Sequence, residues 1–289
     1  MTAILEAVSE ITTVSAAVQP TGGSGARPSD APLAALRRLV ADTGLRGSVG
    51  YAIARLVEAS EHVRDQMSLD TWMVLGRLER IVAGIPADED ELQPHLGQLL
   101  ESLLAIAGII AQSMVRDASW GFLDGGARVE RAQQTASLLR RTLTRPRPPV
   151  ADGQLTESVL YVTESIITHR RRSATGEGPA APAQSAVSLL VFDRGNPRSI
   201  AYQLDRLVED MALIGDEALA SQAVDIREGL ASLDLEEACA GDRSILARRM
   251  DSITSDLRAY SDAITAAHFG RPAPARQMPS SWFSTQEEG

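Results

Sequence analysis

Two stretches of this chain carry nearly the same sequence, and their relationship constrains the fold more than any other feature. Residues 39–59 read LVADTGLRGSVGYAIARLVEA, and residues 190–210 read LVFDRGNPRSIAYQLDRLVED. At an offset of 151 residues, ten of the 21 columns are identical without a gap. The same offset aligns residues 4–12 with residues 155–163. The sequence therefore predicts an internal duplication.

Both copies show the periodicity of helices. Apolar residues fall on one face of a helix after Pro197, at spacings of three and four, at Ile200, Leu204, Leu207, Val208, Met211 and Ile214. No stretch has the strict alternation of a half-buried strand. We predict an all-α helical bundle, fused into one unit. Its expected helices are Ala3–Val18, Leu33–Ala41, Gly47–Met67, Ser68–Ala83, Leu92–Val115, Ala118–Thr144, Gln154–Arg171, Gln184–Phe192, Pro197–Ile214, Asp216–Ala231 and Arg243–His268.

The segment that opens the second copy has no counterpart in the first. It covers residues 116–143, and its equivalent would fall before Met1. We expect one helical domain over residues 1–268, made of pseudo-repeats of about 1–115 and 116–268, whose first copy lacks its opening helix. Three explanations stay open: a start codon placed late, a helix supplied by another chain, or loss of the helix.

Composition restricts the classes of function. A formal net charge of −10 argues against nucleic acid as the main partner, because phosphate neutralisation needs a basic face. All 28 basic residues are arginine, so the chain supplies neither a P-loop lysine nor a Schiff-base lysine. The single cysteine, Cys239, excludes an intrachain disulfide and indicates a reducing compartment, so we expect a cytoplasmic protein.

Neither a membrane span nor a catalytic motif is indicated. The longest apolar run, Leu99–Val115, is shorter than the roughly 20 residues that a spanning helix needs, so we predict a buried helix and no membrane contact. The histidines share no metal-ligand spacing, and HExxH, CxxC and GxSxG motifs do not occur. We expect no metal, no cofactor and no catalytic residue. Residues 269–289, with three prolines, are expected to form a disordered tail.

The DRGNP segment, residues 193–197, predicts a tight corner between two helices. In this corner, Gly195 would end one helix in the left-handed conformation, Asn196 would cap the next helix, and Pro197 would occupy its first position. Asp193 and Ser199 flank these residues and belong to the same corner. This role is structural.

Charged and aromatic side chains gather at the start of the unpaired segment, and they are the strongest binding candidates. Arg128 and Arg131 are three residues apart on one helix face and could grip a carboxylate or phosphate. The alternative is a salt-bridge ladder with the Arg55/Glu58 and Arg206/Glu209 pairs. The full candidate set is Arg116, Asp117, Trp120, Arg128, Glu130 and Arg131.

A second basic cluster, His169, Arg170, Arg171 and Arg172, lies at a predicted helix end. Positive charge at a helix C-terminus is favourable by itself, by roughly 0.3–1 kcal/mol per charge. The equivalent residues 18–21 of the first copy carry no such charges, which keeps an anion-binding role open.

These motifs resemble the alpha-E family of bacterial helical proteins. The family motif RDxxWxFLxxGxxxERA is matched at Arg116, Asp117, Trp120, Phe122, Leu123, Gly126, Glu130, Arg131 and Ala132. The family's basic motif has a Tyr on each side of three arginines, where this chain has His169 and Ser173. Members usually open with a helix that ends in Glu-Arg-Ala. They occur beside, or fused to, circularly permuted ATP-grasp proteins and transglutaminase-like peptidases.

The resemblance implies a part in peptide-bond ligation or modification. We expect a non-catalytic accessory or scaffold of an ATP-grasp type ligase, with oligomerisation left open. The alternative is a helical enzyme whose pocket of arginine and glutamate acts on a peptide or an acyl-phosphate.

Overall fold

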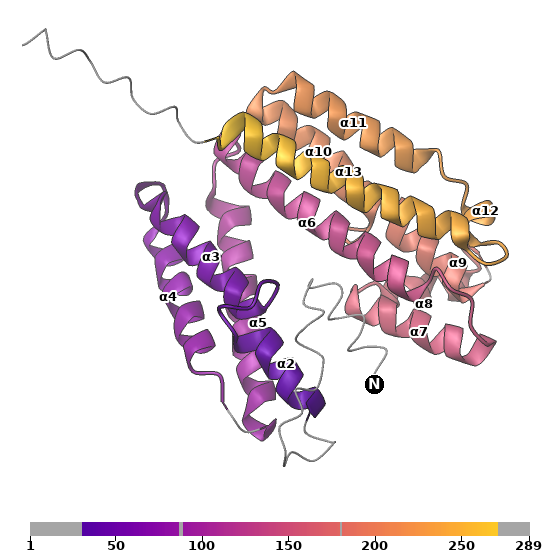
Figure 1. The fold of residues 1–289 in the computed structure, drawn as a ribbon, viewed down its shortest axis with the longest axis horizontal. Helices are drawn as coiled ribbons and strands as arrows, with labels where there is room; N and C mark the ends of the chain where they lie inside the picture. Colours follow the sequence, from indigo (N-terminus) through magenta and orange to yellow (C-terminus); the bar gives the residue numbers. More distant parts are fainter. Residues whose placement is uncertain (1–30, 87–88, 180, 271–289) are drawn as a thin grey trace, which may run out of the picture.

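The structure is a computed structural model that describes residues 31–86, 89–179 and 181–270. Within these ranges the chain is helical and contains no strand, which confirms the predicted fold class. The predicted helix Ala3–Val18, and the predicted tail beyond Gly270, lie outside the described residues. Figure 1 shows that helices α2–α5 stand to one side of helices α6–α13.

The first half contains four helices and one 3₁₀ turn among its described residues. Helix α4 contacts both α3 and α5, and α2 contacts α3 and α4. Apolar side chains of α3, α4 and α5 meet in a core that includes Ile53, Val57, Leu75, Leu78, Leu99 and Ile106. The elements are α2 (Ala31–Ala41), α3 (Val49–Glu61), η1 (Arg64–Gln66), α4 (Leu69–Ala83) and α5 (Glu89–Ser113).

The second half is built around a ring of four helices, in which α6 contacts α10 and α13, and α11 also contacts both. Its core includes Leu139, Leu190, Leu204, Leu207, Met250 and Leu257. The elements are α6 (Ala118–Thr142), α7 (Pro149–Val162), α8 (Ile166–Thr175), α9 (Pro182–Val187), the π-helical turn η2 (Ser188–Phe192), α10 (Ile200–Ile214), α11 (Glu217–Ala231), α12 (Leu235–Cys239) and α13 (Ser244–His268).

The apolar side chains of the described residues divide into two cores, one in each half. Every helix pair with substantial contact lies within α2–α5 or within α6–α13 in this part of the chain. The sequence predicted one fused bundle, which these contacts do not test and which stays a prediction. Helix α6, which continues from α5, makes its substantial contacts with helices that follow it.

Close approach of α6 to α10 depends on two glycines. A Cβ atom on Gly121 would lie 2.8 Å from the carbonyl oxygen of Asp210, and one on Gly125 would lie 2.9 Å from the side chain of Met211. Contacts shorter than about 3 Å are not tolerated by packed carbon atoms. Only glycine at position 121 therefore lets the two backbones meet without a shift.

Equivalent corners precede α3 and α10. Ser48 Oγ accepts a hydrogen bond from the Tyr51 amide at 2.9 Å and donates to the Asp42 carbonyl. At the offset of 151 residues, Ser199 Oγ accepts from the Tyr202 amide at 3.0 Å and donates to the Asp193 carbonyl. The two serines are the N-caps of their helices, with φ, ψ values of −75°, 157° and −79°, 152°.

Several details of the predicted corner are wrong. Ser199, and not Asn196, caps α10, and the helix begins at Ile200, so Pro197 lies outside it. Gly195 does not have a positive φ, and its amide donates to Asp193 Oδ1 at 2.7 Å. Because Asp193 already turns the chain through this bond, the corner does not require a left-handed glycine.

Asn196 holds the corner in place through its side chain. Its Nδ2 donates to the Leu189 carbonyl at 3.0 Å and to Ser165 Oγ at 3.2 Å, and its Oδ1 accepts from the Arg198 amide. The amide thus ties the corner to η2 and to the turn between α7 and α8.

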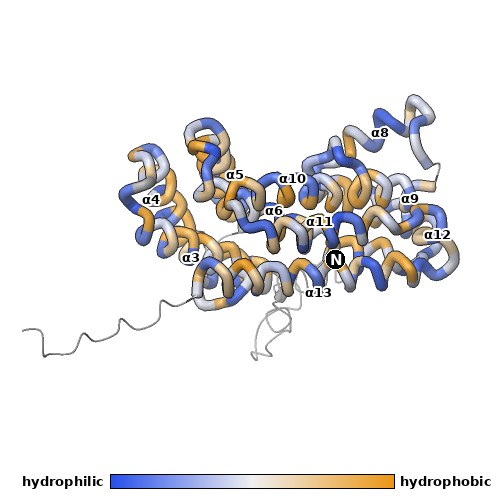
Figure 2. The backbone as a smooth tube through the Cα atoms, turned by 90° about the horizontal axis from the view of Figure 1, so that it is seen from above, coloured by the Kyte–Doolittle hydropathy of each residue, from blue (hydrophilic) through white to orange (hydrophobic). Residues whose placement is uncertain are grey.

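The predicted helix Gln154–Arg171 is two helices. Thr163 and Ser165 donate their hydroxyls to nearby backbone carbonyls, which competes with helical hydrogen bonding. Glu164 between them has a φ of 53°, in the left-handed region. The chain therefore turns here, and α8 extends away from the ring as a largely hydrophilic helix (Figure 2).

Helix α5 is far more exposed than the sequence predicted. Residues 91–113 are long and apolar enough to span a membrane by length and composition, and 17% of that window is buried. The prediction of a buried helix fails because α5 packs one face against α4 and leaves the opposite face uncovered in the described part of the chain.

Candidate functional site

The start of α6 is held by local contacts. Asp117 is the N-cap, and its Oδ1 accepts from the Trp120 amide at 3.2 Å. The Arg116 guanidinium stacks over the Trp120 ring at 3.4 Å and donates to the Ala111 carbonyl at 2.7 Å. Arg116, Asp117 and Trp120 therefore fix the junction between α5 and α6.

Arg128 is fully engaged inside the protein. Its Nη2 and Nε donate to the two oxygens of Asp124 at 2.6 and 3.0 Å, and its Nη1 donates to Gln203 Oε1 at 3.1 Å. This fork occupies the planar guanidinium and joins α6 to α10. To bind a carboxylate or phosphate together with Arg131, as the sequence predicted, Arg128 would have to release these partners.

Arg131 differs from Arg128 because it has no hydrogen bond and no ion pair among the described residues. Burial, together with the neighbouring charges of Arg198 and Arg128, lowers the pKa of its guanidinium. Arg198 itself binds Glu164, with Nη2 and Oε2 separated by 2.6 Å. Arg131 thus lies half-buried beside two other arginines, and the nearby carboxylates of Asp124 and Glu164, which partly offset this lowering, are paired with Arg128 and Arg198.

A buried carboxylate pair lies close to this cluster. Asp210 is 1% exposed, and neither of its oxygens accepts a hydrogen bond from a donor in the described residues. Burial, followed by the nearby Asp124 carboxylate, raises the pKa of Asp210 to about 7. Asp124, in contrast, accepts the bidentate bond from Arg128.

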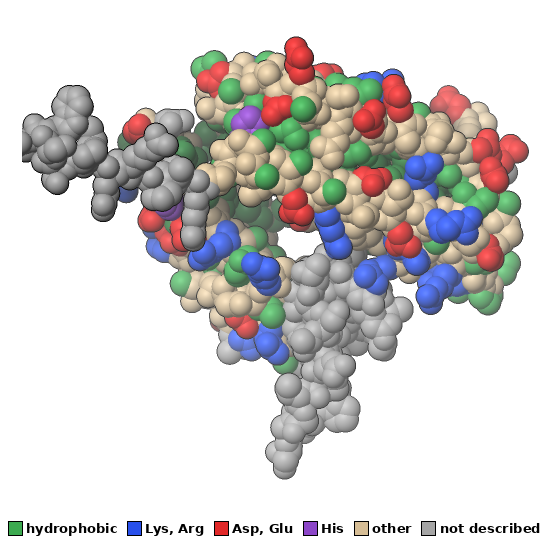
Figure 3. Space-filling model, turned by 45° about the horizontal axis from the view of Figure 1, so that its top comes forward, with side chains coloured by type: hydrophobic (Ala, Val, Ile, Leu, Met, Phe, Trp, Pro, Cys, Tyr) green, Lys and Arg blue, Asp and Glu red, His purple; other side chains and the backbone are tan. Residues whose placement is uncertain are grey.

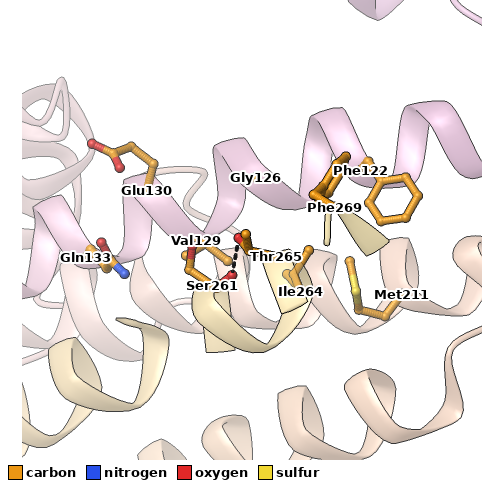
Figure 4. A pocket seen from close by; sticks show the side chains of 10 residues that line it. All are labelled: Phe122, Gly126, Val129, Glu130, Gln133, Met211, Ser261, Ile264, Thr265 and Phe269. Atoms are coloured by element: carbon orange, nitrogen blue, oxygen red, sulfur yellow. Dashed lines mark hydrogen bonds between the residues drawn. The ribbon is translucent and has the colours of Figure 1, made fainter. Parts of the chain in front are cut away.

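Glu130 faces a different surface from Arg131. Its Oε1 accepts from Gln134 Nε2 at 2.8 Å, and its side chain lines a cavity of about 240 Å³ between α6 and α13 (Figure 4). Consecutive residues of a helix project about 100° apart. The cavity is lined by Phe122, Gly126, Val129, Glu130, Gln133, Met211, Ser261, Ile264, Thr265 and Phe269, so the two residues do not share one pocket.

The second basic cluster, on α8, is divided among separate partners. Arg170 pairs with Glu157, Arg172 Nη1 lies 2.6 Å from Asp193 Oδ2, and His169 Nδ1 lies 3.1 Å from Ser185 Oγ. Burial, and then the charge of Arg170, lowers the pKa of His169. Arg171 is exposed. The four residues therefore point to different neighbours and do not converge on one site.

The alternative of a salt-bridge ladder is met only within helices: Arg128 pairs with Asp124 on α6, and it forms no bridge to the Arg55/Glu58 or Arg206/Glu209 pairs. Arg55 pairs with Glu58 and Arg206 pairs with Glu209, each within its own helix and with exposed side chains. Groups of three or more metal-binding side chains do not occur within residues 31–86, 89–179 and 181–270. Burial raises the pKa of the Cys239 thiol, which disfavours a reactive thiolate.

Five residues of the arginine site were not predicted from the sequence: Asp124, Glu164, Arg198, Gln203 and Asp210. Asp124 could have been found, because it lies four residues before Arg128 on the same helix. The others come from distant parts of the chain, and only the fold brings them to α6.

Figure 3 shows basic side chains more frequent toward the lower edge of one face of the molecule and acidic side chains toward its upper edge.

Comparison with known proteins places the whole helical region in one family. A family model, described as a predicted alpha-helical domain with a conserved ER motif, matches residues 2–269. The chain is 32% identical over 249 residues to uncharacterised proteins of Mycobacterium tuberculosis and Mycobacterium bovis. Each alignment covers 81% of this chain and 28% of the relative, so the chain spans under a third of these curated relatives. No solved structure matches it.

Proposed function

The chain belongs to the Alpha-E family, and from this we propose that it is a non-catalytic accessory or scaffold protein of a peptide-modifying system. The enzyme that it assists would be a ligase of the ATP-grasp type or a transglutaminase-like peptidase. We place both in the cytoplasm. The proposal rests on the association with such enzymes that the resemblance implies. The long additional sequence of the relatives supports it, because there the matched region is 28% of a larger protein.

The observation that carries the proposal is the state of Arg131. A half-buried guanidinium beside Arg128 and Arg198 is stabilised by an anion, and the nearby carboxylates of Asp124 and Glu164 are bound to Arg128 and Arg198 rather than to Arg131. Glu130 and Arg131 form the Glu-Arg pair of the motif that the sequence analysis matched to the family. We assign Arg131 the role of contacting a carboxylate or phosphate of the ligase or of its substrate.

We also propose that the two halves arose by duplication. The hydrogen bonds of Ser48 and Ser199, made to equivalent partners 151 residues apart, support this origin. The pairing of α3 with α4 and of α4 with α5, like that of α10 with α11 and of α11 with α13, supports it further. Under this proposal the described residues of the first half contain no counterpart of α6.

Affinity purification from the native cytosol tests the proposed function. The tagged full chain is compared with Arg131→Ala and with Arg171→Ala, a control that removes an exposed arginine from α8. We expect a stoichiometric ATP-grasp type protein with the wild-type chain and the control. Recovery with Arg131→Ala should fall about tenfold, as for loss of a buried charge-assisted contact.

Two results would contradict different parts of this proposal. Recovery of no ligase or peptidase with the wild-type chain contradicts the accessory role. Equal recovery with wild-type and Arg131→Ala chains contradicts the role of Arg131 and leaves the accessory role standing.

A further inference from the structure

The cavity of about 240 Å³ between α6 and α13 has an apolar end and a polar end. Figure 4 shows Phe122, Phe269 and Met211 at one end of it. Glu130 and Gln133 lie at the other end. An apolar cavity of roughly 150 Å³ is already large enough to hold a benzene molecule. This cavity can therefore take a ligand that carries one apolar side chain and a small polar group.

The wall that α6 contributes is open at its centre. Phe122, Gly126 and Glu130 follow one another at a spacing of four, so they share one face of the helix. A Cβ atom on Gly126 would meet nothing within 4 Å. The glycine therefore leaves a space between the aromatic ring and the carboxylate, on the same face as both.

The apolar end is fixed by contacts between aromatic rings. The Phe122 ring centroid lies 4.9 Å from that of His268 and 5.3 Å from that of Phe269, with both pairs edge to face. His268 is held in turn by Asp216, with Nε2 and Oδ2 3.0 Å apart. Phe269 is nevertheless 61% exposed. An apolar side chain that enters here would cover this exposed ring and be stabilised by the area that it removes from water.

The polar end offers one negative charge and one amide. Of the described residues that line the cavity, Glu130 alone is charged. Its Oε1 accepts from Gln134, and the carboxylate has no ion pair within residues 31–86, 89–179 and 181–270. The Gln133 side chain makes no hydrogen bond in the same part of the chain. A carboxylate binds an ammonium group, and an amide NH₂ donates to a carbonyl oxygen.

We propose that this cavity binds the N-terminal residue of a peptide, with the ammonium group on Glu130 and the first carbonyl oxygen on Gln133. The apolar side chain of that residue packs against Phe122 and Phe269. The inference goes beyond the accessory role, because it assigns a ligand to this chain itself. It does not depend on Arg131, which lies on a different side of α6.

Isothermal titration calorimetry of the purified full chain tests the inference, with the tripeptide Leu-Gly-Gly as the probe. We expect saturable binding with a Kd below about 1 mM. The N-acetylated tripeptide should bind at least about tenfold more weakly, since acetylation removes the charge that the carboxylate recognises. Glu130→Gln should weaken binding of the unmodified tripeptide about fivefold, as for an exposed ion pair. Glu228→Gln is the matched control, because it makes the same change at an exposed glutamate of α11 outside the cavity, and it should bind like wild type.

A second variant tests whether the ligand occupies the cavity. Gly126→Leu places a side chain in the open space and should abolish binding. Folding should be retained, because the added Cβ meets no neighbour, and circular dichroism checks this. Binding that Gly126→Leu leaves unchanged would overturn the inference, because the ligand would then lie elsewhere.

An amine without a carbonyl group tests the assignment to a peptide. Isopentylamine carries a similar ammonium and apolar group, and it should bind about fivefold more weakly than Leu-Gly-Gly, since Gln133 has nothing to donate to. Gln133→Ala should remove this difference. Equal affinities of the wild-type chain for the two ligands would overturn the assignment.

Absence of saturable binding up to roughly 10 mM tripeptide would overturn the inference as a whole. The assay contains no ligase and no arginine variant, so its failure is distinct from failure of the proposed function.

Discussion

Helices α3, α4 and α5 contact one another in the same order as α10, α11 and α13, and the two rows differ in what covers them. In the second half, α6 closes the ring of α10, α11 and α13, and Leu207 is fully buried. In the first half, α3, α4 and α5 form an open row, and the equivalent Leu56 is half-buried. Similar local sequence therefore lies in different surroundings, because α6 packs onto the second row and no described helix packs onto the first row in the same way.

The largest expected difference between the halves is in the free energy of unfolding that is lost when Leu207 or Leu56 is replaced by alanine. Leu207→Ala should lower the free energy of unfolding by about 3 kcal/mol, because it opens a cavity in a closed core. Leu56→Ala should cost about 1 kcal/mol, because its side chain already contacts solvent. Denaturant unfolding of both variants measures the difference. Equal losses would contradict the account that α6 closes the second half while the first half stays open.

The glycine contact of α6 gives the next largest effect. Gly121→Ala should destabilise the second half by about 2 kcal/mol, since a Cβ atom would lie 2.8 Å from a backbone oxygen. Gly126→Ala is the matched control on the same helix, where a Cβ meets nothing within 4 Å, and it should stabilise by about 0.5 kcal/mol. Thermal unfolding with both variants distinguishes a clash from a change in helix propensity.

Asp210 should make the stability of the second half depend on pH. Burial and the nearby Asp124 raise the pKa of Asp210 to about 7 in the folded protein, above the roughly 3.9 of an unfolded chain. The stabilisation by the protonated form is complete below about pH 4 and is lost as the pH rises through 7. Asp210→Asn should therefore stabilise at pH 8, by on the order of 1–2 kcal/mol, and have little effect at pH 4.

Urea unfolding at these two pH values checks the prediction. The counterpart of Asp210 is Ala59, so the first half has no corresponding titration. A stabilising effect of Asp210→Asn that is the same at both pH values would show that Asp210 is not the titrating group.

The smallest expected difference between the halves is in the stability lost when the N-cap serine of either corner is replaced. Ser48→Ala and Ser199→Ala each remove a helix N-cap and should each cost about 1 kcal/mol. Because both serines make equivalent bonds, the two losses should agree more closely than those of Leu56 and Leu207. Calorimetry of both variants measures them, and a large inequality would break the equivalence of the corners.

Helical periodicity predicted the fold class and most of the helices, because it depends on local sequence. The details that failed depend on tertiary contacts. Asn196 was expected to cap a helix, but its amide reaches Leu189 and Ser165, which no local pattern specifies. The exposure of α5 was missed for the same reason, since an apolar helix has the same sequence whether or not a neighbour covers it.

The candidate site was predictable only in part. Arg128 and Arg131 were expected to act together because they share a helix face. The structure separates them, since Asp124 and Gln203 bind Arg128 and leave Arg131 without such partners among the described residues. Gln203 and Arg198 arrive at α6 from about 70 residues away, so spacing along the chain could not identify them.

Hydrogen–deuterium exchange of the full chain, resolved by peptide, tests the central comparison most directly. Because α6 packs onto α10 and α13, and no described helix packs onto α3 and α5 in this way, amides of α3 and α5 should exchange at least about tenfold faster than the aligned amides of α10 and α13. Equal or slower exchange in α3 and α5 would contradict the account, because it would mean that the first half is already closed.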